Sequence, residues 1–508
     1  MELQLGTLFV RVMTRALREK EVGHVSYFFY QPFFFEFPKQ LGKYSAGTIL
    51  LVGNLFNQKE SRFFSWRSSD HGKTWNIVGG WQPGGGATSG IWEPFLFLDS
   101  KDRLVAVFSD QRDWKHHAQK LVHVFSENGG DTWSAPVNND VVSTEQIWRP
   151  GMATVARMDN GEYLMSYEWC KDDGHGGTDN SVQCPVHVKT SPDGVTWDKH
   201  YPGTVISTPD GIQPCGSPYT IWDASQKALI VSARSWRWHT ELSRLTPENE
   251  GIVLINTQYG KGDWAWATSP WHPPPSSDIC GANYSPNLLV LPDNNILYTT
   301  EATLPETPGI PNDKLPCELR TGSVTIGQLP YSSNFSTKGQ AGWIDFNGTW
   351  SISGDQYEFA PVTEPATIAI TGSSGWTDYK MSADVIITSD SGVVGLVART
   401  SASLSAPNFL TRYTAAIDSN SGKLTVYRVT DTSTALKSAS HSGGIKVKKL
   451  YHMSFSVQSN KLTAVLSEDG GASTNLSVTD DGLKSGLAGL YGHYGSGGFK
   501  NVEINSLT

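Results

Sequence analysis

Pairs of short apolar runs recur between residues 30 and 301, and the second run of each pair ends in polar residues. The first runs begin just after a proline, and these prolines are Pro32, Pro94, Pro150, Pro218 and Pro286. The second runs lie at 48–54, 104–110, 163–168, 228–234 and 296–301. Proline at the first residue of a strand removes no ladder hydrogen bond. The pattern therefore predicts a repeated unit that starts with two antiparallel strands.

A turn motif follows the third apolar run in the first three units. It consists of a small hydroxyl residue, an Asp or Asn, a Gly and then Thr-Trp, and it occurs at 68–75, 126–133 and 191–197. The Asx side chain can bond its own backbone, the Gly takes a left-handed dihedral, and the Trp packs on the strands below. The motif resembles the Asp-box, the hairpin turn of sialidase-type β-propellers. Copies spaced about sixty residues apart indicate a repeat architecture.

Together, the paired runs and the turn indicate a four-stranded blade that repeats along the chain. The sequence thus predicts an all-β, sialidase-like propeller. Six blades are expected: five are clear in the pattern, and the sixth would combine residues after 302 with the N-terminal segment.

The pattern changes near residue 341, where tryptophan becomes rare and the turn motif stops. Runs that alternate apolar and polar residues follow at 378–388, 392–400, 424–429, 452–458 and 461–467. Such alternation is typical of half-buried antiparallel strands. We therefore expect residues 341–508 to form an antiparallel β-sandwich of the jelly-roll or concanavalin-like kind, which would bind carbohydrate. Residues 27–340 would form the catalytic propeller, after an atypical segment at 1–26.

The composition narrows the class of protein. The 508 residues are too many for one core, and a formal net charge of −9 argues against a nucleic-acid partner. No apolar run reaches the roughly 18 residues that would span a bilayer. Residues 1–23 make a poor signal peptide because Arg11 and Arg15 interrupt the apolar stretch. We nevertheless expect a secreted monomer, since Asn-x-Ser/Thr sequons are present at Asn283, Asn334, Asn347 and Asn475.

The cysteines and histidines show no metal-binding pattern. The five cysteines are Cys170, Cys184, Cys215, Cys280 and Cys317. Their spacing fits no zinc site, so we expect one or two disulfides, with buried thiols as the alternative. The adjacent His116 and His117 would point to opposite faces of a strand. We expect no cofactor and no catalytic metal, whereas a structural Ca²⁺ would find Asp and carbonyl ligands in either domain.

The topology of a propeller gathers the candidate site residues on one face. The turn motif joins the third and fourth strands, so it marks the face away from the loop between the second and third. The strand starts and the polar strand ends converge on the opposite face. Carboxylates, arginines and aromatic residues meeting there suit sugar recognition and acid–base chemistry. They are Trp92, Glu93, Asp110, Arg112, Trp148, Arg149, Glu168, Ser217, Tyr219, Arg234, Glu241, Tyr284 and Glu301.

Several runs between residues 92 and 170 carry a likeness to a known family. They are Trp92-Glu93-Pro94-Phe95, Ser109-Asp110-Gln111-Arg112-Asp113, Gln119-Lys120-Leu121-Val122-His123, Arg149-Pro150-Gly151-Met152 and Tyr167-Glu168. They resemble glycoside hydrolase family 93, the fungal exo-1,5-α-L-arabinanases, over residues 30 to 330. The resemblance implies a six-bladed propeller, a retaining mechanism with two glutamates and no metal. The C-terminal sandwich is an addition to the basic arabinanase.

Within this resemblance, Glu168 matches the first catalytic glutamate, because it ends a second strand that aims at the axis. The partner would come from the next blade, and the candidates are Glu241 as first choice, Glu248 and Glu250 of the same loop, and Glu301 of a later blade. Substrate contacts would involve Trp92, Glu93, Asp110, Arg112, Trp148, Arg149, Tyr219, Arg234 and Glu301. Trp92 and Trp148 would stack on sugar rings or pack between blades. Asp110 and Arg112 could equally form a surface ion pair.

Two other functions fit part of the pattern. Tyr284 resembles the strand position that carries the nucleophilic tyrosine of sialidases, although a packed strand tyrosine fits equally. Sialidases use three arginines for the substrate carboxylate, and Arg149 with Arg112 or Arg234 would serve, but Gln31 stands where the first arginine is usual. A propeller lectin would show similar pockets between successive blades, whereas the polar residues here differ from blade to blade. The leading prediction is a retaining exo-acting hydrolase of arabinan.

Overall fold

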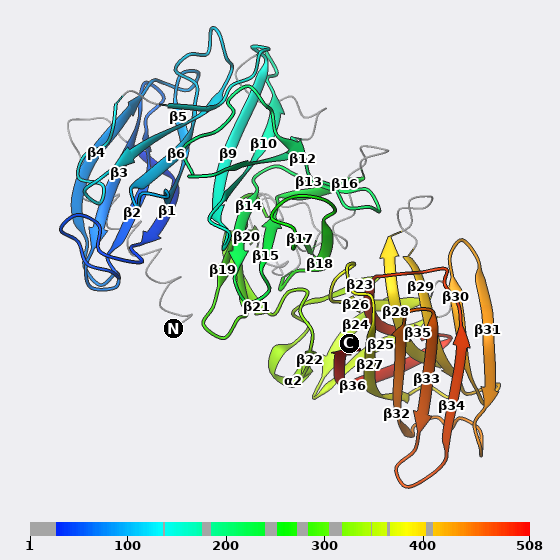
Figure 1. The fold of residues 1–508 in the computed structure, drawn as a ribbon. Helices are drawn as coiled ribbons and strands as arrows, with labels where there is room; N and C mark the ends of the chain where they lie inside the picture. The colour runs from blue at the N-terminus through cyan, green and yellow to red at the C-terminus, as the bar shows by residue number, and fades with distance from the viewer. Residues whose placement is uncertain are drawn as a thin grey trace, which may run out of the picture.

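A computed structural model gives the fold of the protein. The residues that it describes are 27–135, 138–174, 184–238, 251–271, 283–303, 317–346, 348–362, 366–402 and 410–507. They form two all-β units, a propeller and a sandwich, which lie side by side in Figure 1. Within these ranges there is one short helix, α2 (Phe335–Lys338), and no helix is long and apolar enough to cross a membrane.

The propeller consists of antiparallel blades whose strands follow one another in each sheet. The first blade contains β1 (Phe28–Glu36), β2 (Ile49–Phe56), β3 (Ser61–Ser68) and β4 (Asn76–Gly84). The second contains β5 (Ile91–Leu98), β6 (Leu104–Asp110), β7 (Lys120–Ser126) and β8 (Asn138–Val141). The third contains β9 (Trp148–Arg157), β10 (Tyr163–Lys171), β11 (Val186–Ser191) and β12 (Thr204–Val205). The fourth and fifth contain β14 (Tyr219–Asp223), β15 (Ala228–Ser232), β17 (Ile252–Asn256) and β18 (Ala265–Thr268), and β19 (Asn287–Val290), β20 (Ile296–Thr303) and β21 (Cys317–Val324). The pair β13 (Ile212–Cys215) and β16 (Ser235–Trp238) forms a separate two-stranded sheet.

The second strand of a blade is covered on both faces, which explains its continuous apolar run. Every residue of β6 and of β15 is buried. Blades pack face to face around the axis, so a central strand has no solvent-facing side and need not alternate. The apolar runs that the sequence analysis picked out are therefore the interior of the propeller.

A residue with left-handed backbone interrupts the start of each blade. The φ angles of these residues lie between 42° and 60°, and the residues are Gln31, Glu93, Met152, Ser217 and Asn283. The pairing of β1 with β2 and of β5 with β6 shifts register at this position. Such bulges turn a side chain out of the sheet. Because the first strands of successive blades lie against one another, these residues face the centre of the propeller.

The three predicted turn motifs close the third strand of a blade onto the fourth, as expected. In the third blade, Ser191 Oγ accepts the Gly194 N–H at 3.0 Å and Asp193 Oδ1 accepts the Thr196 N–H at 2.7 Å. Trp197 Nε1 donates to the Gly194 carbonyl at 3.1 Å. The hydroxyl and Asx contacts recur in the first two blades. Each turn therefore satisfies its own backbone groups.

The fourth blade contains a related turn that the sequence analysis missed. Asn256 Oδ1 accepts the N–H groups of Gln258 and Gly260, each at 2.8 Å. Its Nδ2 donates to the carbonyls of Lys261 and Asp263, at 2.8 and 3.0 Å. The turn escaped notice because it lacks the hydroxyl residue and the Thr-Trp pair of the other three.

The predicted sixth blade is not among the described residues. After residue 302, β21 pairs with β20 as the third strand of the fifth blade. The next strand, β22 (Tyr331–Ser333), pairs with β36 (Gly495–Ser506) in the sandwich. The described part of the propeller therefore has a five-bladed arrangement, and the sandwich takes in Tyr331–Ser333, which the sequence analysis placed in the propeller.

The C-terminal unit is an antiparallel sandwich of two sheets. One sheet contains β24 (Trp350–Ser353), β25 (Gln356–Val362), β36, β27 (Tyr379–Ile387), β32 (Leu450–Gln458), β33 (Lys461–Ser467) and β34 (Ser473–Thr479), with β22 at its side. The other contains β23 (Trp343–Phe346), β26 (Thr367–Thr371), β35 (Leu487–His493), β28 (Val393–Ala402), β29 (Leu410–Asp418), β30 (Lys423–Val429) and β31 (Ser433–Ser440). The residues of β27 alternate between buried and partly exposed, as a half-buried strand requires.

The sandwich packs directly on the outer edge of the fourth blade. Ala267 of β18 forms a β-bridge with Ser373, the Thr268 N–H donates to the Gly372 carbonyl at 3.0 Å, and the Ser374 N–H donates to the Trp266 carbonyl at 2.8 Å. An edge strand with unpaired backbone groups would invite aggregation, so this contact protects it. A single buried apolar cluster runs from the fourth and fifth blades into the sandwich core.

Candidate active site

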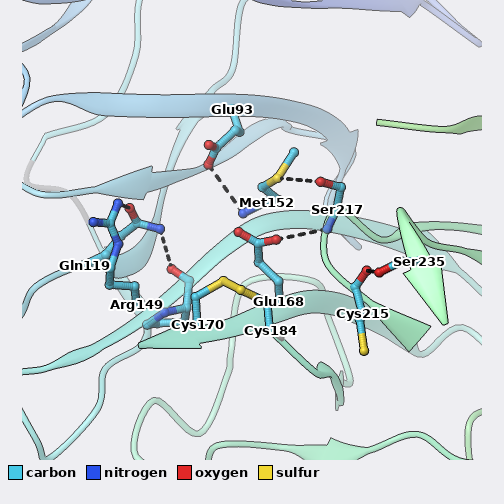
Figure 2. Close-up of a disulfide and its surroundings, with 11 residues drawn as sticks. Glu93, Gln119, Arg149, Met152, Glu168, Cys170, Cys184, Cys215, Ser217 and Ser235 are labelled. Atoms are coloured by element: carbon cyan, nitrogen blue, oxygen red, sulfur yellow. Dashed lines mark hydrogen bonds between the residues drawn. A yellow bond between two sulfur atoms is a disulfide. The ribbon is translucent and has the colours of Figure 1, made fainter. Parts of the chain in front are cut away.

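Side chains from four blades form one hydrogen-bonded chain at the centre of the propeller. Gln31 Nε2 donates to Glu93 Oε1 at 3.3 Å, and Gln31 Oε1 accepts the Glu93 N–H at 3.0 Å. The Met152 N–H donates to Glu93 Oε2 at 3.4 Å, and Ser217 Oγ lies 3.1 Å from Met152 Sδ. Each of these residues is the left-handed residue of its blade. The backbone bulges therefore build the floor of a site on the propeller axis, part of which is drawn in Figure 2.

Glu93 belongs to this chain of hydrogen bonds, and the pKa of its carboxyl differs from the ordinary value. Burial is the largest influence and raises its pKa, while a hydrogen bond from the Ser109 hydroxyl opposes the rise. The charge of Glu168 raises the pKa further, and the Met152 N–H and the Arg149 guanidinium lower it. The balance brings the pKa of Glu93 to about 7. A carboxyl in this state can hold or release a proton near neutral pH.

Glu168 lies at the end of β10, as the sequence analysis predicted. Burial raises its pKa above the ordinary value, and the Ser217 N–H and the guanidinium groups of Arg149 and Arg234 act in the opposite direction. The Ser217 N–H donates to Glu168 Oε2 at 2.9 Å. Figure 2 shows this bond and the Glu168 carboxylate facing the same space as Glu93. A partly buried glutamate with a raised pKa is suited to donate a proton.

Gly151 separates the two carboxyl groups. A Cβ at this position would lie 3.5 Å from Glu168 Oε1 and 3.4 Å from the Ser109 hydroxyl that bonds Glu93. It would also lie 2.5 Å from Gln119 Nε2, so the Gln119 side chain would have to move. The glycine in Arg149-Pro150-Gly151-Met152 therefore lies beside Glu168 and beside the hydroxyl that bonds Glu93, and it adds no side chain there.

Two arginines and a tyrosine line the same space. Arg149 is mostly buried, with Nη1 3.4 Å from Asp172 Oδ2 and Nη2 3.3 Å from Gln119 Oε1. The guanidinium of Arg234 lies 4.5 Å from the centre of the Tyr284 ring. Burial raises the pKa of Tyr284, Glu168 and Glu93 raise it further, and Arg234 lowers it. Tyr284 therefore belongs to the same electrostatic cluster as the two glutamates.

The remaining predicted substrate contacts fall into two groups. Asp110 and Arg112 pair with each other through two bonds of 2.8 Å, and within the described residues no hydrogen bond joins them to Glu93 or Glu168. The aromatic candidates have packing partners: Trp92 lies 5.1 Å from Phe56, Trp148 6.0 Å from Trp169, and Tyr219 5.9 Å from Phe95, measured between ring centres. Burial also raises the pKa of Tyr219 to about 12.

The proposed partner of Glu168 lies outside the described residues. This holds for Glu241 and for its alternatives Glu248 and Glu250. Glu301 of β20 is exposed and close enough to raise the pKa of Tyr284. Among the described residues, Glu93 is the carboxyl whose charge couples to that of Glu168.

Several members of the site were not predicted from the sequence. Gln31 was read as an argument against a sialidase, and Met152, Gln119 and Asp172 were not singled out as site residues. A signal for Gln31 was present, because it directly precedes a blade-opening proline, as Glu93 and Ser217 do. Gln119 and Asp172 could not be found in this way, since they reach the site from loops.

A disulfide joins Cys170 and Cys184 next to Glu168, in agreement with the expectation of one or two disulfides. Cys215 is buried. In the described part of the chain, Glu168 with Cys170 and Cys184 is the one cluster of metal-ligating side chains close enough to share an ion. Because both sulfurs are committed to the disulfide, the donor set in this state does not fit a metal.

Comparisons with known proteins give likenesses among solved structures. No family model and no curated protein matches the chain. The α-L-arabinofuranosidase Arb93A of Fusarium graminearum is 27% identical over 58% of this chain and 77% of its own, with a TM-score of 0.46. An α-L-arabinanase of Penicillium chrysogenum complexed with arabinobiose is 24% identical over 60% and 79%, with a TM-score of 0.46.

A third likeness involves a different kind of protein. The carbohydrate-binding module CBM66 from Bacillus subtilis is 19% identical over 33% of this chain and 98% of its own, with a TM-score of 0.28. Over more than half of its length, the chain is similar to solved structures of α-L-arabinofuranosidases of glycoside hydrolase family 93.

Proposed function

We propose that the propeller is a retaining, exo-acting glycoside hydrolase of α-1,5-linked arabinan that uses Glu168 and Glu241. The observation that carries the proposal is the cluster at the axis, where the partly buried side chains of Glu93 and Glu168 face one space beside Arg149 and Arg234. Retaining glycosidases need one carboxylic acid that donates a proton and one carboxylate that attacks the sugar. The choice of arabinan as the substrate rests on the motifs between residues 92 and 170, which resemble those of glycoside hydrolase family 93.

In this proposal Glu168 is the acid and base. Its proton goes to the glycosidic oxygen as the bond to the anomeric carbon breaks, and the Glu241 carboxylate forms a covalent bond to that carbon. Glu168, now ionised, then takes a proton from water, and the water oxygen displaces Glu241 to release the sugar product. Burial supports the first role of Glu168, because it raises the pKa, and the Ser217 N–H supports the second, because it stabilises the carboxylate.

The test is incubation with linear 1,5-α-arabinan and proton NMR of the first product. A retaining enzyme releases a product with the α-anomer in initial excess, and exo action gives one short product throughout the time course. An initial β-anomer would contradict the retaining mechanism. A ladder of long fragments would contradict exo action, and no hydrolysis of any arabinan would overturn the proposed substrate.

A sialidase-like hydrolase remains the second candidate because Tyr284 lies within the same cluster. The Arg234 guanidinium stacks on its ring, and Glu168 is near enough to perturb its pKa. A nucleophilic tyrosine requires a phenol that ionises readily, whereas the carboxylates here oppose ionisation. Replacing Tyr284 by Phe should therefore leave arabinan turnover within about tenfold of wild type. Complete loss of turnover, together with release of sialic acid by the wild type, would favour the sialidase mechanism.

We further propose that the protein is a secreted monomer whose sandwich binds polysaccharide. The disulfide beside Glu168 supports an oxidising compartment. Localisation of the tagged protein in culture medium would test secretion. Pull-down by insoluble polysaccharide would test binding by the sandwich. Soluble arabino-oligosaccharide is added to fill the catalytic site of the propeller. Binding through the propeller alone then disappears, whereas binding through the sandwich remains.

A further inference from the structure

The Cys170–Cys184 disulfide lies against the proposed catalytic glutamate. Cys170 follows Glu168 by two positions in β10, and residues two apart on a strand share a face. A carboxylate oxygen of Glu168 and the two sulfurs all lie within 4.8 Å of one another. Figure 2 shows the disulfide directly beside the Glu168 side chain.

The disulfide also connects Glu168 to its hydrogen-bond donor by a second route. The Gly216 N–H donates to the Cys184 carbonyl at 2.9 Å, and Pro185 forms a β-bridge with Cys215. Ser217 follows Gly216, and its N–H donates to Glu168 Oε2 at 2.9 Å. Glu168 is therefore connected to Ser217 in two ways: directly by the hydrogen bond from the Ser217 N–H, and indirectly through Cys170, the disulfide, Cys184 and Gly216.

The backbone along this indirect connection needs an external constraint. Cys184 has a φ angle of 48°, in the left-handed region that side-chain-bearing residues rarely adopt, and Gly216 has 72°. Such conformations persist only when the surrounding structure holds them in place. The disulfide supplies a covalent constraint at one end of the segment.

We infer that the Cys170–Cys184 disulfide is a positioning element of the active site, which holds the Ser217 N–H on the Glu168 carboxylate and makes the activity sensitive to reduction. The inference rests on the proposed role of Glu168. Reduction by a dithiol transfers two electrons and two protons, so that the S–S bond becomes two thiols and the dithiol closes to a cyclic disulfide. The freed Cys184 segment then no longer fixes Gly216 and Ser217.

The consequence has a definite sign. The Ser217 N–H favours the ionised form of Glu168, so losing it raises the pKa of Glu168 further. The limb of the pH–rate profile that belongs to Glu168 should move to higher pH, whether Glu168 acts as acid or base. A hydrogen bond to a charged group has a strength that corresponds to a shift of about one pH unit.

The test compares the wild type with Cys170→Ser/Cys184→Ser by the pH dependence of kcat and KM on arabino-oligosaccharide. The expected result is an upward shift of one limb and a fall in kcat of about tenfold, with KM nearly unchanged. Dithiothreitol should produce the same change in the wild type and none in the double variant, which serves as the control for other thiols. An unmoved limb with intact far-UV circular dichroism would overturn the inference.

A direct titration separates this inference from the proposed function. Carbon-13 NMR of labelled glutamate carboxyls, with the Glu168 signal assigned by its loss in Glu168→Gln, reports the pKa without any substrate. The pKa should rise on reduction of the wild type with dithiothreitol, and this arm also decides the matter if the double variant fails to fold. An unchanged pKa would contradict the positioning role even in an active enzyme. A raised pKa in a protein that hydrolyses no arabinan would support it while overturning the proposed substrate.

Discussion

The pKa values of Glu168 and Glu93 depend on two opposing effects, burial and stabilisation of the ionised carboxylate. Burial raises the pKa of both carboxyls, and each is partly stabilised by hydrogen-bond donors and by Arg149. An ion without such donors would cost several kcal/mol to bury, about 1.4 kcal/mol for every pKa unit. The donors here reduce that cost without removing it, which leaves carboxyls that can still take up a proton.

Replacing Glu168 by Gln keeps the shape of the side chain and removes its proton-transfer chemistry. We expect turnover on arabino-oligosaccharide to fall by roughly 10²–10⁴-fold, with little change in thermal stability. Steady-state kinetics and calorimetry measure the two effects. The matched control is Glu162→Gln, because Glu162 bonds Asn160 in the turn at the opposite end of the same hairpin. Equal loss in both variants would point to a structural effect rather than to catalysis.

Replacing Glu93 by Gln should change how stability depends on pH. The pKa of Glu93 is about 7 in the folded protein, against 4.5 for the exposed group. The folded state therefore binds more protons between these values, so the wild type loses stability as the pH rises through that window. Glu93→Gln should remove this loss, and the difference in Tm between variant and wild type should grow from pH 4.5 to 7.

Differential scanning calorimetry across this pH range measures the effect. The comparison variant is Glu93→Ala, which also removes the charge but leaves the Ser109 hydroxyl without the carboxylate that accepts its hydrogen bond. It should be less stable than Glu93→Gln at every pH. A Tm difference between Glu93→Gln and wild type that stays constant with pH would contradict the raised pKa.

At the scale of the element, two short devices define a blade. The bulge at the first strand turns a side chain toward the axis, and the Asx turn closes the third strand onto the fourth at the other face. The two devices lie on opposite faces, so turns can be repeated for stability while axis residues vary between Gln31, Glu93, Met152 and Ser217. The site is therefore asymmetric because the residue at the bulge differs from blade to blade, while the backbone structure of the blades is the same.

The turn of the third blade offers a clean test of its own stabilisation. Burial acts to raise the pKa of Asp193, but hydrogen bonds from the Val195 N–H and from Thr196 outweigh it and lower the pKa to about 2. The turn therefore contributes stability at pH values above the ordinary 3.8 and loses it as the pH falls toward 2. Asp193→Ala should cost about 1–3 kcal/mol at neutral pH, measured by urea unfolding, and less near pH 2.

The chain itself provides the control for this substitution. The second blade has Asn128 at the equivalent position, where Nδ2 donates to Thr132 Oγ1 at 2.8 Å and Oδ1 accepts the Thr132 N–H at 3.0 Å. Asp193→Asn should therefore retain most of the stability and lose only its dependence on acid pH. A loss as large as that of Asp193→Ala would show that charge, rather than the hydrogen-bonded turn, stabilises the blade.

At the scale of the whole molecule, the propeller and the sandwich share one interior. Trp266 of β18 is buried, its ring N–H donates to Asp210 Oδ2 at 2.9 Å, and its backbone N–H donates to Ser374 Oγ in the sandwich at 2.9 Å. Ser401 of the sandwich donates to the same Asp210 oxygen at 3.0 Å. Two units joined by buried apolar and polar contacts should behave as one cooperative body.

Replacing Trp266 by Ala tests this coupling. The loss of a buried aromatic side chain should cost about 3–5 kcal/mol and lower one shared unfolding transition. Calorimetry detects the transition, and hydrogen exchange of sandwich amides shows whether the second unit is weakened too. The control is Trp114→Ala, since Trp114 is 46% exposed and its removal should leave stability nearly unchanged. Two separate transitions, with only the propeller affected, would contradict a shared interior.

The repeating features of this protein could be predicted from its amino-acid sequence. The blade strands, the three Asx turns, the sandwich and the position of Glu168 at the end of β10 were all predictable, because each depends on residues close together in the chain. A central blade strand must be apolar throughout, and a self-bonded turn needs its hydroxyl, Asx and Gly within a few positions. The turn at Asn256 in the fourth blade was not predicted, because its residue types differ from those of the other three turns.

Which residues act together depends on how distant segments of the chain pack in space. Glu93 gains its pKa of about 7 from burial and from Glu168, which is far away in sequence. The Ser217 N–H and the Cys170–Cys184 disulfide reach the Glu168 region from separate segments, and the sandwich covers β18 through contacts more than 100 positions apart. Short-range pattern carries no information about such pairings, since desolvation and charge coupling depend on distance in space rather than along the chain.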